Sequence, residues 1–128
     1  MIFIKNQVKE LLVKIPLEVL YVLIALVIAI YIHEFGHFMA AKNYQLDARF
    51  GIDKEGFFVE TFSQDPFINA IINHSGPIMN LIISFLGLAS ILIIPKVENV
   101  KTLLIVISMT NILVALISLT TFAYTGVL

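Results

Sequence analysis

Residues 19–42 read VLYVLIALVIAIYIHEFGHFMAAK, and this stretch decides the fold class. Val19 to Ile32 carries no charge, and apolar character resumes from Phe38 to Ala41 before Lys42 ends it. A membrane-spanning helix needs roughly 20 mostly apolar residues. The stretch therefore predicts a membrane span over residues 17–42.

Two further stretches have the same character. No Lys, Arg, Asp or Glu occurs between Asp65 and Lys96, and none occurs from Thr102 to Leu128. They predict two more spans, at residues 66–95 and 101–128. Because a chain in lipid must satisfy its backbone hydrogen bonds internally, each span is expected to be a helix. The sequence predicts an all-α membrane protein with three transmembrane helices.

The composition supports this fold class. Hydrophobic residues make up 59% of the chain and charged residues 13%, against about 45–50% and about 25% in soluble domains. Eight Lys and Arg against nine Asp and Glu give a net charge of −1, which excludes nucleic acid as a partner. We expect an integral, multi-pass protein of the cell membrane. It would form a single membrane domain over residues 1–128, with the lipid bilayer as its surroundings.

Residues 1–16 differ from the three spans. Their apolar residues fall on one helical face, which predicts a short interfacial helix whose lysines lie near the lipid headgroups. The alternative is a leader without stable structure. The apolar face comprises Ile4, Val8, Leu11, Leu12 and Ile15, and the lysines are Lys5, Lys9 and Lys14.

Residues 43–65 form the only substantial polar loop. A polar turn over residues 53–56 separates two runs rich in aromatic or β-branched residues, at 48–50 and 57–59. This pattern predicts a short hairpin-like loop between the first two spans.

The sequence His33-Glu34-Phe35-Gly36-His37 matches the H-E-x-x-H motif. Residues four apart share one face of a helix, so both imidazoles can bind one Zn²⁺. Glu34 can then act as general base toward a water that the metal polarises. The missing side chain of Gly36 would leave room for an extended substrate. Ionisable groups within a span are costly unless paired or metal-bound, which favours a functional site over a chance match.

Residues 73–77 (NHSGP) interrupt the second span, and Asn80 follows one turn later. Pro77 cannot donate to the carbonyl of Asn73, which leaves that group available to a substrate or to water.

The depth of each histidine in the membrane follows from a rise of 1.5 Å per residue. His37 and His33 lie about 8 and 14 Å from Lys42 along the first span. His74 lies about 12 Å from Pro66, where the same loop ends. Because the three histidines lie at similar depth, we predict His74 as a third zinc ligand; the alternative is a polar helix-packing residue beside a proline kink.

The chain resembles the site-2 protease family of intramembrane zinc metalloproteases, and the match covers most of its length. The family shares a core of three membrane helices. The matching features are the H-E-x-x-H motif late in one span, a hairpin-like loop, Ser75-Gly76-Pro77 with Asn80 in the next span, and Asn111 in the third. The resemblance implies that His33 and His37 are zinc ligands, that Glu34 is the catalytic base, and that Asn80 lies near the substrate or the oxyanion.

One feature departs from the family pattern. The family's third ligand is an Asp in an Asn-x-x-Pro…Asp-Gly pattern of the third core helix. Residues 118–126 (SLTTFAYTG) contain neither the proline nor the aspartate. Thr125 occupies roughly the expected place, but a neutral hydroxyl is a poor zinc ligand. Truncation, replacement of the ligand by His74, and loss of catalysis are the three explanations.

We therefore expect an intramembrane zinc metalloprotease-like protein that hydrolyses a peptide bond in or near a membrane helix. Its partner would be a membrane-embedded peptide or protein substrate. One alternative is an inactive or truncated relative that binds a membrane peptide or a partner helix, and another is a small structural membrane protein without metal. The expected catalytic residues are Glu34 and Asn80, and the expected zinc ligands are His33, His37 and His74.

Overall fold

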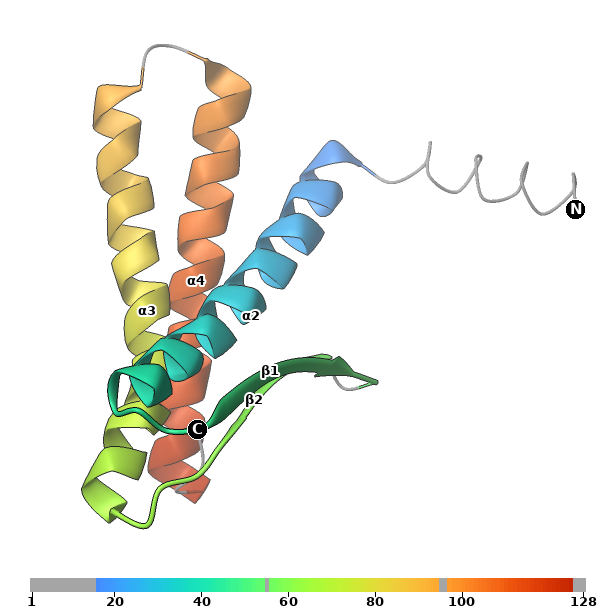
Figure 1. The fold of residues 1–128 in the computed structure, drawn as a ribbon. Coiled ribbons are helices and arrows are strands. Elements are labelled where there is room, and N and C mark those ends of the chain that lie inside the picture. Colours follow the sequence, from blue (N-terminus) through green and yellow to red (C-terminus); the bar gives the residue numbers. More distant parts are fainter. Residues whose placement is uncertain (1–15, 55, 95–96, 126–128) are drawn as a thin grey trace, which may run out of the picture.

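The computed structural model describes residues 16–54, 56–94 and 97–125 (Figure 1). These residues form three long helices and one β-hairpin. In chain order the elements are α2 (Leu17–Asn43), β1 (Ala48–Asp53), β2 (Gly56–Thr61), α3 (Pro66–Ile93) and α4 (Glu98–Thr125). Residues 1–15, and with them nearly all of the predicted interfacial helix, lie outside the described residues.

All three helices are long and apolar enough to cross a membrane, as the sequence predicted. The chain is an all-α membrane protein with three transmembrane helices. Two helix starts coincide with the predicted spans, at residues 17 and 66. The third helix begins three residues before the predicted span, where Glu98 lies in its first turn and complements the positive end of the helix dipole.

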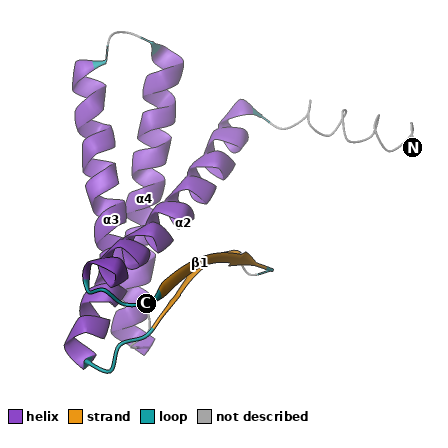
Figure 2. Cartoon of the chain, in the orientation of Figure 1, coloured by secondary structure: helices purple, strands orange, loops and turns teal. Residues whose placement is uncertain are grey.

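The helices α3 and α4 run antiparallel side by side, and α2 crosses them at an angle (Figure 1). The C-terminal half of α2 lies against α3, whereas its first turns diverge from the pair. The β-hairpin projects from the end at which α2 stops and α3 begins, as the orange strands of Figure 2 show. Both β-strands contact α2.

The interior of the helix bundle is built from small and polar residues. Many large apolar side chains point outward; Leu92, for example, is 89% exposed. Lipid is as apolar as leucine, so small residues that permit close backbone approach drive helix association in membranes. The buried face of α2 comprises Ala25, Ala29, His33, Gly36, His37 and Ala41.

The backbones of α2 and α3 approach each other closely at Gly36. A Cβ atom added there would lie 2.6 Å from the Ser75 carbonyl oxygen and 2.9 Å from the Cα atom of Gly76. The backbone of α3 therefore fills the space that the sequence assigned to an extended substrate. Gly36 serves helix packing instead.

The hairpin is fastened to α2 by aromatic side chains. Its two strands pair antiparallel along their whole length, and the Asp53 side chain accepts a hydrogen bond from the Gly56 backbone N–H at the turn. The Tyr31 ring of α2 lies 5.3 Å from the Phe50 ring and 5.7 Å from the Phe57 ring, centroid to centroid. These contacts hold the hairpin over the part of α2 that carries the H-E-x-x-H motif.

Candidate metal centre

The side chains of His33, Glu34 and His37 form a group that could hold a metal ion, and we call these three residues the metal group. One potential ligand atom from each lies within 4.8 Å of the other two. The histidines are one helical turn apart on the buried face of α2, with exposed fractions of 8% and 9%. Within residues 16–54, 56–94 and 97–121, no other three His, Cys, Asp or Glu side chains come together in this way.

A hydrogen bond fixes the orientation of the His37 ring. Its Nδ1 lies 2.7 Å from the carbonyl oxygen of Ile72 in α3. A carbonyl can only accept, so Nδ1 carries the proton and donates, and Nε2 keeps its lone pair. Metal-binding histidines commonly make this kind of bond with the ring nitrogen that does not face the metal.

The two Nε2 atoms meet beside Gly76 of α3. A Cβ atom added to Gly76 would lie 2.5 Å from Nε2 of His37 and 2.9 Å from Nε2 of His33. Two nitrogens that share one tetrahedral zinc ion at 2.0–2.1 Å are roughly 3.4 Å apart, and the potential ligand atoms of this group lie within 4.8 Å of one another. Gly76, and not Gly36, is therefore the glycine whose missing side chain leaves room for the two Nε2 atoms.

The carboxylate of Glu34 lies on the side of α2 that the hairpin covers. The backbone of Val59 in β2 hydrogen-bonds to it. Beside it is a pocket of about 160 Å³, so the metal group borders a small hollow between α2, α3 and β2. The lining residues are His33, Glu34, His37, Val59, Thr61, Ile72 and Asn73.

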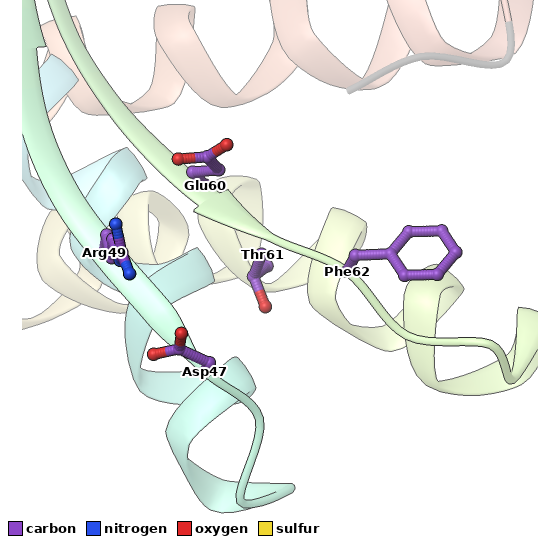
Figure 3. Close-up of a pocket in the computed structure, with 5 residues that line it drawn as sticks. All are labelled: Asp47, Arg49, Glu60, Thr61 and Phe62. Atoms are coloured by element: carbon purple, nitrogen blue, oxygen red, sulfur yellow. The ribbon is translucent and has the colours of Figure 1, made fainter.

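A larger hollow of about 530 Å³ adjoins this pocket at the base of the hairpin (Figure 3). It is lined by Asp47, Arg49, Glu60, Thr61 and Phe62. Thr61 lines both spaces, and its buried Oγ1 has no hydrogen-bond partner among the described residues. Charged side chains therefore border a space that shares Thr61 with the pocket at the metal group.

The structure does not bring His74 to the metal group, so this residue does not supply the predicted third ligand. Its Nδ1 bonds to the carbonyl of Ala70 on its own helix, and the side chain lines an apolar groove with Ile71 and Ile78. The reason is helical phase. His74 precedes Gly76 by two residues, which is about 200° around α3, so similar depth does not place it on the face that meets α2.

Asn80 lies beside His33, on the Nδ1 side of its ring. It is completely buried, and its Nδ2 is 3.4 Å from Nδ1 of His33. Asn111 of α4 is also completely buried. The Thr125 side chain lies outside the described residues.

Three contributors to the site escaped the sequence analysis. They are the Ile72 carbonyl and the hairpin residues Val59 and Thr61. A backbone carbonyl and two ordinary strand residues carry no chemical signature in a sequence. Only their contact with α2 marks them.

Comparison with known proteins gives no relative. No family model matches the chain, and neither a curated protein nor a solved structure matches it significantly.

Proposed function

We propose that this chain is an intramembrane zinc metalloprotease-like protein that hydrolyses a peptide bond in or near a membrane helix. One observation carries the proposal: His33, Glu34 and His37 converge at a pocket inside a helix that is long and apolar enough to span a membrane. The resemblance of the motifs to those of the site-2 protease family supports it.

The two histidines would hold the metal through Nε2, and the donor set suits zinc, which accepts imidazole nitrogen in catalytic sites. When bound, Zn²⁺ supplies Lewis acidity toward a water and a peptide carbonyl. Glu34 would remove the proton from the attacking water and pass it to the leaving amine. Glu34 lines the pocket together with Val59, so its carboxylate is on hand for this proton transfer.

The size of the pocket indicates the form of the substrate. An α-helix with its side chains is about 10–12 Å across, too wide for a hollow of about 160 Å³. The substrate would therefore enter as an unwound, extended segment. The larger, charged hollow at Thr61 would admit the water that hydrolysis consumes.

The test uses the purified full chain in detergent micelles, with single-span membrane peptides analysed by mass spectrometry. We expect about one zinc per chain and cleavage of a peptide within or beside its apolar segment. Glu34→Gln should keep the zinc and lose cleavage, because Glu34 acts as base and not as ligand. Glu98→Gln, the same chemical change at the far end of α4, should match wild type. Cleavage by the Glu34→Gln variant at the wild-type rate would refute the mechanism.

A second candidate function follows from the ligand count. Zinc prefers at least three protein ligands, and among the described residues Glu34 is the one carboxylate that joins the two histidines. With Glu34 as third ligand, the chain would be a metal-binding protein that holds a membrane peptide or partner helix without cleaving it. In that case Glu34→Gln would lose zinc as severely as His37→Ala does.

A further inference from the structure

Asn80 is a completely buried polar residue whose hydrogen bonds are incomplete. Its exposed fraction is 0%, and its Oδ1 has no hydrogen-bond partner among the described residues. Its Nδ2 lies 3.4 Å from Nδ1 of His33, which is long for a hydrogen bond. An unpaired buried acceptor is unfavourable, so the surroundings of this amide should show a better arrangement.

The state of His33 decides which amide atom should face it. Its Nε2 points to the place beside Gly76 where Nε2 of His37 also lies. If Nε2 binds a metal, Nδ1 must carry the ring proton and needs an acceptor. The nitrogen of Asn80 is a donor, whereas its oxygen is an acceptor, and a 180° rotation about χ2 exchanges the two. A metal on His33 therefore favours Oδ1 of Asn80 at Nδ1.

A second buried acceptor lies at about the same level of the bundle. Asn111 of α4 donates through Nδ2 to the Ile107 carbonyl, 2.8 Å away, so Oδ1 is its remaining acceptor, and that oxygen is also buried without a described partner. The two asparagines share one level of the bundle. Ser84 donates to the Ser108 carbonyl across the two helices, and one turn onward along the antiparallel pair lie Asn80 and Asn111.

We propose that Asn80 is a positioning residue: its side-chain oxygen accepts a hydrogen bond from Nδ1–H of His33 and so holds Nε2 toward the metal. The inference rests on the metal centre of the proposed function. It assigns to Asn80 a role other than binding the oxyanion of the reaction. Helix α3 would then orient both histidine ligands, because the Ile72 carbonyl already accepts a hydrogen bond from Nδ1 of His37.

The test measures zinc affinity of the full chain in micelles by competition with a chromophoric chelator. Asn80→Leu keeps the shape and removes the acceptor, and should weaken zinc binding 10- to 100-fold, the usual effect of losing such a partner. Asn80→Asp keeps an acceptor and should restore affinity to near the wild-type value. Ser108→Ala is the control, because it removes a buried hydroxyl that lies against Gly87 and not at the histidines.

A second measurement needs no variant. Nitrogen-15 NMR of histidine-labelled wild type with zinc bound should show His33 protonated at Nδ1 and metal-bound at Nε2. Wild-type affinity in Asn80→Leu, equal weakening in Asn80→Asp, or metal at Nδ1 of His33 would each overturn the positioning role and leave the metal centre standing. Failure of the wild-type chain to bind zinc would overturn both. Peptide cleavage does not enter either readout.

Discussion

Replacing Gly76 by alanine is the most direct test of the metal centre's geometry. The new Cβ atom would lie 2.5 Å from Nε2 and 2.7 Å from Cε1 of His37, and 2.9 Å from Nε2 of His33. Ordinary contact begins at 3.4 Å, so the His37 ring must retreat by roughly 1 Å or the helices must separate by that amount. Zinc sites tolerate only about ±0.2 Å in their bond lengths.

We expect Gly76→Ala to weaken zinc binding at least 100-fold, because the displaced atom is itself a ligand. A factor of 100 corresponds to about 2.8 kcal/mol. In an ordinary helix interior, alanine in place of glycine stabilises the helix by about 1 kcal/mol. A loss of zinc affinity in Gly76→Ala would therefore not come from a weakened helix. Chelator competition in micelles gives the affinity, and circular dichroism shows that the helices persist.

Gly87→Ala provides the matched control in the same helix. Its Cβ atom would meet the hydroxyl of Ser108, the movable end of a side chain far from the histidines. Zinc affinity should remain at the wild-type value in this variant. If Gly76→Ala also binds zinc as wild type does, the two Nε2 atoms do not form the metal site and the reasoning is wrong.

Three other predictions follow from the packing. Gly36→Ala should lower the free energy of unfolding by about 1–3 kcal/mol in a micelle titration, because its Cβ atom would meet the immovable Ser75 carbonyl; unchanged stability would contradict the close helix crossing. His74→Ala should leave zinc affinity within twofold of wild type, whereas a loss of orders of magnitude would restore this residue as a ligand. Phe50→Ala should remove the ring contact to Tyr31 and speed hydrogen exchange in the hairpin while zinc affinity persists; unchanged exchange would show that other contacts hold the hairpin.

Much of this protein follows from short-range sequence patterns. The three helices follow from uncharged stretches, because a chain in lipid has no other way to satisfy its backbone hydrogen bonds. The pairing of His33 with His37 follows from the helical repeat, which places residues four apart on one face. The structure has a hairpin between α2 and α3, where the turn at Asp53 and Gly56 lies between two strand-forming runs.

The tertiary structure alone decided which residues of α3 face the metal group. Depth in the membrane can be counted from a sequence, but the rotation of one helix against another depends on where their backbones approach. Here that point is Gly36 against Gly76, and it turns the Ile72 carbonyl and Asn80 toward the histidines and His74 away from them. These partners lie 35 and 47 residues along the chain from the histidines they contact, beyond the reach of any local periodicity.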